Sequence, residues 1–141
     1  MNINIRGELY NLSSSKVMGI LNLTPDSFYD GGKYNSVEDI SNQISKMVDD
    51  GLDILDIGGY SSRPGAKNIS SDEEKSRVLP VLKNIKKKFP QLVISIDTFR
   101  SEIAEACLIE GADIINDISS GILDKEMMKT ISKFNCPYIM M

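Results

Sequence analysis

The sequence predicts an α/β fold, in which a parallel sheet of about five strands is covered by four helices and preceded by a small β-hairpin. Short runs rich in Ile, Leu and Val recur along the chain, and charged segments of helical length separate most of them. This alternation is typical of βα units that build a parallel sheet. Because the runs are almost continuously apolar, we expect both faces of the sheet to be buried. The expected strands are residues 17–21, 53–57, 93–97, 112–117 and 137–141.

The hairpin and the helices follow from local signals. Residues 2–5 and 8–12 flank Arg6-Gly7 and predict a hairpin ahead of the first long strand, where it would cover the bottom of the sheet. Four segments between the strands have the length and charge of helices. These expected helices are residues 37–50, 72–88, 100–110 and 123–134.

Capping residues mark the ends of several helices. Ser36 with Asp39, and Ser71 with Glu74, have the Ser-x-x-acid spacing of helix N-caps. Gly51 and Gly111 follow the last turns, where a left-handed residue is favoured. The junctions at residues 50–57 and 110–118 are the same helix-Gly-strand pattern used twice, about sixty positions apart. Such a repeat of βα pairs predicts a barrel or a wound sheet.

Length and composition predict one globular domain. The 141 residues are 41% hydrophobic, which is enough for a buried core. No apolar run reaches the length of a membrane span and no secretory signal opens the chain, so we expect a soluble, cytoplasmic protein. Cys107 and Cys136 lack metal-type spacing and are expected to be reduced, buried thiols.

The charged residues restrict the chemistry. A net charge of −4 and a pI near 4.8 argue against nucleic-acid binding. The sequence contains no histidine, so the commonest general base and transition-metal ligand is missing. Carboxylates, amides, hydroxyls, Arg and Lys remain, and they suit Mg²⁺ and phosphate esters. The basic run at residues 86–88 is interpreted as a solvated helix end rather than a phosphate site.

One apolar strand leads directly into a loop dense in oxygen atoms. Asn22 closes the run 17–21 and is followed by Gly31-Gly32 after a short polar loop. Loops at the carboxyl ends of barrel strands hold the chemistry of α/β enzymes. The segment is therefore either a site for a cation or phosphate, or an ordinary turn rich in capping residues. Its oxygen-bearing side chains are Thr24, Asp26, Ser27 and Asp30.

Four motifs in this order resemble the dihydropteroate synthase family. They are the segment 19–32, Gly-Gly-Tyr-Ser-Ser-Arg-Pro-Gly at 58–65, Ser-Ile-Asp-Thr at 95–98 and Ile-Asn-Asp-Ile-Ser at 115–119. The resemblance implies a (β/α)₈ barrel, of which this single domain of residues 1–141 is the N-terminal half. Residues 1–15 are then the hairpin, and residues 16–141 are barrel strands one to five.

The resemblance also implies an activity in folate biosynthesis. The family condenses 7,8-dihydropterin-6-ylmethyl diphosphate with 4-aminobenzoate and releases diphosphate with the help of Mg²⁺. It is a sulfonamide target, and complete members form homodimers through later helices. In relatives the later strands also supply an Asp, a Lys and basic residues to the site. This chain differs from the usual Glu-Ser-Thr, because it has Tyr60-Ser61-Ser62.

Family positions assign the candidate residues of the first two loops. Asn22 would contribute one neutral oxygen to Mg²⁺ and contact the diphosphate. The first loop, with Phe28 packed on the aryl ring, would close over the site; alternatively Phe28 is a loop hydrophobe at the barrel rim. Arg63 would meet the aminobenzoate carboxylate or the diphosphate with paired donors. The other substrate-binding positions on these loops are Thr24, Asp26, Asp30, Ser62 and Pro64.

The later strand ends would hold the pterin. Asp97 and Asn116 match the donor and acceptor edge of an aminopyrimidinone, and Asp117 is expected to point toward the helix layer. Asp56 either joins this polar cluster or, as the simpler interpretation, is a satisfied strand-end carboxylate. Ile118 and Met141 are candidate apolar walls for the ring, and plain core packing is the alternative for both.

Three functions are compatible with these residues. The first is a dihydropteroate synthase, with Asn22, Arg63, Asp97 and Asn116 as its catalytic residues. The second is a pterin-binding methyltransferase, which shares the barrel and the Asp and Asn strand ends. The third is a non-catalytic half-barrel that needs a C-terminal half.

Overall fold

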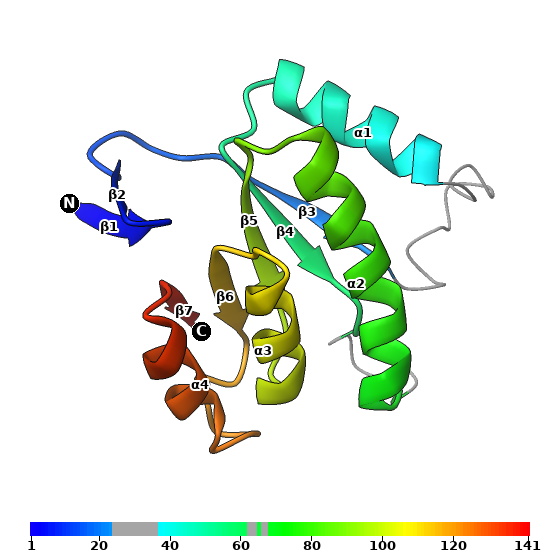
Figure 1. The fold of residues 1–141 in the computed structure, drawn as a ribbon, viewed down its shortest axis with the longest axis vertical. Coiled ribbons are helices and arrows are strands. Elements are labelled where there is room, and N and C mark those ends of the chain that lie inside the picture. The colour runs from blue at the N-terminus through cyan, green and yellow to red at the C-terminus, as the bar shows by residue number, and fades with distance from the viewer. Residues whose placement is uncertain (24–36, 62–64, 66–67) are drawn as a thin grey trace.

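The computed structural model describes residues 1–23, 37–61, 65 and 68–141, and these residues form a five-stranded parallel sheet, helices and a separate hairpin (Figure 1). The sheet order β3-β4-β5-β6-β7 repeats the order along the chain. A doubly wound sheet would reverse its order at a switch point, so the sequential order is that of a barrel segment. The strands are β1 (Asn2–Ile5), β2 (Glu8–Asn11), β3 (Met18–Asn22), β4 (Ile54–Gly58), β5 (Val93–Asp97), β6 (Ile114–Asp117) and β7 (Tyr138–Met140).

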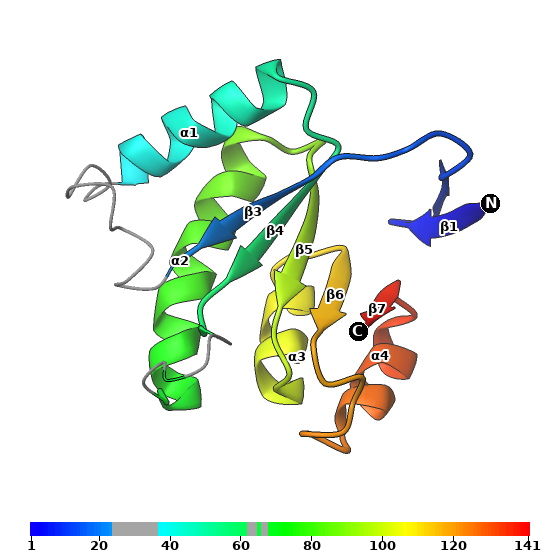
Figure 2. The ribbon, with the colours of Figure 1, turned by 180° about the vertical axis from the view of Figure 1, so that it is seen from behind.

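The helices of the described residues lie on one face of the sheet, and the opposite face is open in the view from behind (Figures 1 and 2). Strand residues that point toward the helices, such as Leu55, Ile57 and Ile96, are fully buried. They pack against Val78 and Ile103, among other helix residues. The prediction of a partial barrel is thus confirmed. The helices are α1 (Val37–Asp49), α2 (Ser71–Lys88), α3 (Ser101–Ile109) and α4 (Met127–Phe134).

The hairpin covers the amino ends of the strands, as the sequence predicts. Ile5 packs against the first residues of β4, β5 and β6, which are Ile54, Val93 and Ile114. Arg6 then fixes the hairpin turn, since it donates to both carboxylate oxygens of Asp113 at 2.7 and 2.8 Å. The same guanidinium donates to the carbonyls of Pro90 and Leu92 at 2.7 and 2.8 Å.

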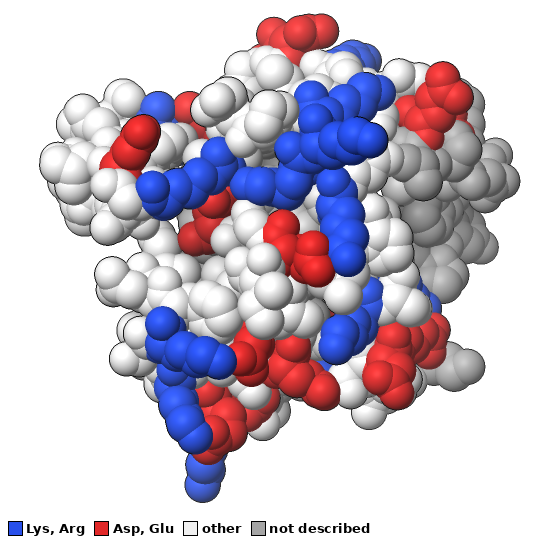
Figure 3. Space-filling model, viewed as in Figure 1, with Lys and Arg blue, Asp and Glu red and all other residues white. Residues whose placement is uncertain are grey.

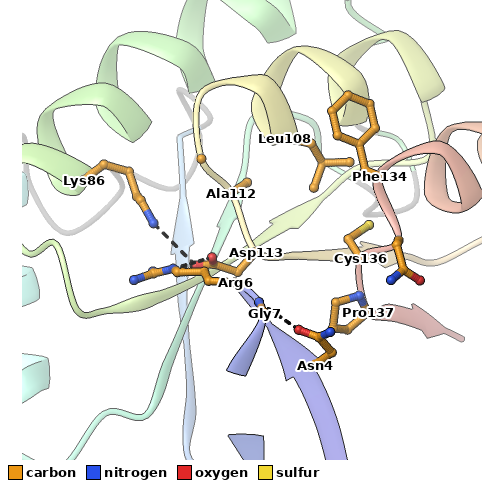
Figure 4. Close-up of a pocket in the computed structure, with 12 residues that line it drawn as sticks. Asn4, Arg6, Gly7, Lys86, Leu108, Ala112, Asp113, Phe134, Cys136 and Pro137 are labelled. Carbon is orange, nitrogen blue, oxygen red and sulfur yellow. Dashed lines mark hydrogen bonds and ion pairs between the residues drawn. The ribbon is translucent and has the colours of Figure 1, made fainter. Parts of the chain in front are cut away.

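A cavity of about 450 Å³ lies beside this ion pair, between the hairpin, the end of α2 and the turns before β6 and β7 (Figure 4). Lys86 points toward Asp113, with 3.5 Å between the ammonium and the carboxylate. Desolvation lowers the pKa of Lys86. The prediction of a solvated Lys86 is therefore wrong, because only 20% of its side chain is exposed and its ammonium pairs with Asp113.

The starts of α2 and α4 differ from the predictions for reasons that side-chain hydrogen bonds explain, and α3 begins one residue later than predicted, at Ser101. Ser70, not Ser71, caps α2, because its side chain accepts from the Glu73 amide at 3.2 Å. Helix α4 begins at Met127 rather than at residue 123. The preceding residues form a turn in which Asp124 accepts from the Ser101 amide at 2.7 Å and so caps α3. Ser36, the other expected cap, lies outside the described residues.

Gly51 and Gly111 have the expected left-handed conformations, with φ of +98° and +94°. Both cysteines are free, and Cys107 is buried while Cys136 is half-buried. Burial raises the pKa of the Cys107 thiol to about 12. None of the described helices is both long and apolar enough to cross a membrane. Acidic and basic side chains are interleaved over the helical face (Figure 3).

Candidate active site at the carboxyl ends of the strands

Parallel pairing places the last residues of the strands in one row. Asn22 pairs with Gly58, Gly58 with Asp97, and Asp97 with Asn116. Ile139 of β7 continues the row beyond Asn116. Residues in register point to the same face of a sheet, which here is the face away from the helices. Three of the four predicted catalytic residues therefore share one surface.

Gly58 leaves a space between two of these side chains. A Cβ atom at Gly58 would lie 3.2 Å from Oδ1 of Asn22 and 3.3 Å from Oδ2 of Asp97. The amide oxygen and the carboxylate oxygen thus border the same small volume, one from each side of β4. Because both are acceptors, this volume suits a ligand that brings N–H groups, a cation or water.

A second polar layer lies one step below the row. Asp56 of β4 is in register with Ser95 of β5, and both are buried. Nδ2 of Asn116 donates to Oδ2 of Asp56 at 3.0 Å, so the bond passes over β5. Three buried atoms of the row and this layer have no hydrogen-bond partner within the part of the chain that the structure describes: Oδ1 of Asp56, Oγ of Ser95 and Oδ1 of Asn116. The interpretation of Asp56 as a satisfied carboxylate is wrong, and its alternative as a member of the polar cluster is confirmed.

The electrostatics of the row centre on Asp97. The pKa of Asp97 is raised to about 6. Burial is the main cause, and the nearby carboxylates of Asp56, Glu74 and Asp117 add to it. The carboxylate is thus ionised at pH 7 and protonated in mild acid. A half-buried carboxylate of this kind is stabilised by any ligand that donates hydrogen bonds to it.

Residues next to the carboxyl ends of β4 and β5 are held by a buried cluster around Glu74, which the sequence offered only as the acid of a helix cap. Glu74 of α2 is completely buried, accepts from the Thr98 hydroxyl at 2.7 Å and forms an ion pair with Arg100. Arg100 also donates to the Ile69 carbonyl at 2.7 Å. Its guanidinium lies 5.2 Å from the ring centre of Tyr60. Tyr60 stands where the family usually has an acid, and its ring contacts the guanidinium of Arg100 instead.

The sequence places Glu74 at the start of a helix, four residues after the cap Ser70. Asp72 and Glu73 share this first turn, so the sequence does not show which of the three acids is buried. Arg100, the partner of Glu74, is not adjacent in sequence, so the pair itself required the structure. Thr98, next to Asp97, donates its amide to the Asn116 carbonyl at 3.0 Å. The cluster therefore holds the backbone of the polar row.

Asp117 belongs to the helix side, as predicted. Its buried carboxylate accepts from the amides of Ser119 and Gly121 at 2.7 and 2.9 Å, and from the Tyr138 hydroxyl at 2.7 Å. Burial and this hydrogen bond raise the pKa of Tyr138. Asp117 therefore stabilises the turn after β6 and does not face the row.

The remaining candidates are placed as follows. Ile118 and Met141 are 44% and 68% exposed at the rim, so neither packs in the core of the described residues. Their role as walls for a ring stays a prediction. The loop candidates lie outside the described residues: Thr24, Asp26, Phe28, Asp30, Ser62, Arg63 and Pro64.

Replacing Gly59 by alanine is expected to destabilise the fold by about 1–3 kcal/mol, because overpacking forces strain into a buried contact. The added Cβ would lie 2.6 Å from Cγ2 of Val78 and 3.2 Å from the backbone oxygen of Glu74. Urea unfolding measures this loss. Gly58→Ala is the matched variant: its closest contact is 3.2 Å, so its stability loss should be smaller. Equal stability of Gly59→Ala and the unmodified chain would contradict the close packing of α2 on β4.

The fold defines an α/β barrel-type protein, and its polar strand ends form a candidate ligand site. The family described as "Pterin binding enzyme" matches residues 18–141. The chain belongs to this family of pterin-binding enzymes.

The most informative relatives carry the name dihydropteroate synthase. The protein of Staphylococcus haemolyticus is 47% identical over 130 residues, which are 92% of this chain and 48% of that protein. Among solved structures, the Yersinia pestis enzyme with a sulfonamide drug has a TM-score of 0.88 at 36% identity, over 99% of this chain and 50% of the other. The Xanthomonas albilineans enzyme with 4-aminobenzoic acid has a TM-score of 0.86 at 35% identity, over 97% and 50%. The chain spans about half the length of these proteins.

Proposed function

We propose that this chain forms the N-terminal half of a dihydropteroate synthase barrel and carries the pterin side of its active site. The single observation that supports this best is the row of Asn22, Asp97 and Asn116 around the space at Gly58. The reaction joins the methylene carbon of 7,8-dihydropterin-6-ylmethyl diphosphate to the nitrogen of 4-aminobenzoate. The carbon–oxygen bond to diphosphate breaks, and the amine nitrogen loses a proton.

The described residues fit the demands of this displacement. The enzyme has to hold the heterocycle, position the weakly basic amine and stabilise the departing charge. Asp97 and Asn116 would accept hydrogen bonds from the ring edge, and their backbones are held by the Glu74 cluster. Because the strand ends are rigid, they reduce the entropy lost when the ring is oriented.

Asn22 would hold Mg²⁺ together with oxygens of the diphosphate and water. Its amide oxygen borders the small volume at Gly58, opposite a carboxylate oxygen of Asp97, and is a ligand type that Mg²⁺ accepts. When bound, the ion would neutralise charge on the leaving diphosphate. Arg63, placed by family position alone, would add paired donors for an anionic group.

The relatives support the second substrate. Structures of similar proteins contain 4-aminobenzoic acid or a sulfonamide drug. We therefore propose that 4-aminobenzoate is the amine here and that sulfonamides compete with it. A cytoplasmic location and homodimers of the complete protein stay predictions.

The proposed function is tested by a turnover assay with Mg²⁺ and both substrates. The chain is mixed with a separately expressed C-terminal half of a 47% identical relative, such as the Staphylococcus haemolyticus protein, and dihydropteroate is measured. We expect product from the mixture. No product from the mixture, although both halves are folded, would contradict the proposal. Methyl transfer to or from a reduced pterin would favour the methyltransferase alternative.

Replacing Asn22 by alanine is expected to weaken Mg²⁺-dependent diphosphate binding by at least about tenfold, because one metal ligand and its positioning are lost. Calorimetry with diphosphate in the presence and absence of Mg²⁺ measures the effect. Asn11→Ala, on the hairpin, is the matched amide control. Unaltered Mg²⁺-dependent binding by Asn22→Ala would remove the metal assignment.

A further inference from the structure

The side-chain amide of Asn116 has only one favourable orientation in this site. Its Nδ2 donates to Oδ2 of Asp56 at 3.0 Å. The bonded oxygen of Asp56 acts as an acceptor, so the reverse orientation of the Asn116 amide would place two acceptor oxygens face to face. Asp56 is only 4% exposed, and water therefore has little access to relieve such a conflict. Asp56 thus holds Oδ1 of Asn116 away from itself.

The Oδ1 atom of Asn116, on the opposite side of the amide from the bond to Asp56, is buried and has no partner in the described residues. Buried polar atoms in native proteins are nearly always hydrogen-bonded, so an atom without a protein partner indicates water or a ligand. Asn116 is in register with Asp97, whose carboxylate is likewise an acceptor. Two neighbouring acceptors therefore face the same side of the sheet.

We propose that Asp56 is a positioning residue that locks the Asn116 amide with its oxygen toward the ligand, so that Asn116 and Asp97 together select a heterocycle edge carrying N–H donors. This inference rests on the proposed function and adds a specificity determinant to the same site. Asp56 acts through Asn116 and does not touch the reacting atoms. Ser95, its register partner, has a small side chain that leaves room for the bond across β5.

The proposal makes a chemical distinction between two closely related rings. Pterin carries an amino group at position 2 of its pyrimidinone, whereas lumazine carries a carbonyl at that position. The amino group can donate to Asn116 or Asp97, but the carbonyl oxygen would meet a fixed acceptor. If Asp56 did not fix the amide, Asn116 could rotate and offer Nδ2 to the carbonyl.

The test compares binding of pterin and lumazine by the full 141-residue chain and by Asp56→Asn, using ligand fluorescence. The unmodified chain should bind pterin at least about tenfold more tightly than lumazine, the size of effect caused by one mispaired buried acceptor. An amide at position 56 can donate or accept, so Asn116 gains its second orientation. The preference should then fall to about threefold or less. Asp50→Asn, an exposed carboxylate after α1, is the matched control and should keep the tenfold preference.

A purely structural role of Asp56 would weaken both ligands equally. An unchanged ratio in Asp56→Asn would therefore overturn the proposal, even if both affinities fell. Circular dichroism of each variant establishes that the fold is retained. If Asp56→Asn is unfolded, Asp56→Glu is tested in its place, because it keeps a carboxylate acceptor and should retain the preference for pterin. Loss of this preference in Asp56→Glu would overturn the proposal.

Nuclear magnetic resonance of the Asn116 side-chain amide separates this inference from the proposed function. One Nδ2 proton should be shifted by its bond to Asp56 in the unmodified chain, and the shift should be lost in Asp56→Asn. The absence of pterin binding by the unmodified chain, with the shift present, would contradict the proposed function and support the lock. An Asn116 signal that is the same in both proteins would overturn the lock whatever the ligand result.

Discussion

Asp97→Asn is expected to reduce pterin binding by at least about 100-fold. The row loses its charged acceptor, and hydrogen bonds to a charged group contribute about 1.5–3 kcal/mol each. The substitution keeps the size of the side chain and adds an N–H₂ group that would oppose a ligand donor. Fluorescence titration with pterin measures the effect, with Asp50→Asn as the exposed control. Binding within threefold of that of the unmodified chain would show that Asp97 does not contact the ring.

The role of Asp97 in pterin binding can also be tested by the pH dependence of binding and of stability. Its pKa is about 6 in the folded protein against an ordinary 3.8. Between pH 4 and 6 the folded chain thus keeps a proton on Asp97 that the unfolded chain releases. The contribution of Asp97 to the free energy of unfolding therefore falls as the pH rises through this window. Pterin binding should rise over the same window, because it needs the carboxylate. Thermal unfolding and binding should both lose this dependence on pH in Asp97→Asn.

Arg100→Ala is expected to destabilise the chain by about 3–5 kcal/mol, since it leaves a buried charge without its partner. Glu74 is fully buried, and the Arg100 side chain is 17% exposed. A loss of this size is a large part of the roughly 5–15 kcal/mol that stabilises a typical domain. Urea unfolding measures it. Lys129→Ala is the matched control, because its pair with Glu126 is exposed and should contribute less than about 1 kcal/mol.

A double variant distinguishes the lost charge pair from lost packing. Arg100→Met with Glu74→Gln removes both charges while it keeps most of the volume, and should recover part of the stability. A cost below about 1 kcal/mol for Arg100→Ala would mean that the Glu74 pair contributes little. A double variant as unstable as Arg100→Ala would instead assign the effect to the contacts with Tyr60 and the Ile69 carbonyl.

Much of the fold was predictable because it depends on local patterns. The strand at residues 93–97 has the predicted bounds, since its β-branched residues begin at Val93 and the strand ends at the polar Asp97. The start of α4 was wrong because Asp124 uses its side chain in a turn and as a cap of a different helix. A pattern of helical residues carries no information about such a distant partner.

The site was predictable in part. The strand-end positions of Asn22, Asp97 and Asn116 follow from the geometry of parallel βα units and from family motifs. The bond between Asp56 and Asn116 does not, because it joins strands separated by sixty residues and by an intervening strand. The Glu74–Arg100 pair likewise depends on how α2 packs over the sheet. Contacts set by packing between distant segments require coordinates.

The attachment of the hairpin has a consequence for the order of folding. Arg6 bonds to the carbonyls of Pro90 and Leu92 and to Asp113, which follows it by 107 residues. Contacts between such distant segments require closure of a long loop, which slows their formation. The hairpin therefore has no complete docking surface until the chain through β6 is assembled. Its attachment is a late event, although during synthesis the hairpin emerges well before the residues to which it binds.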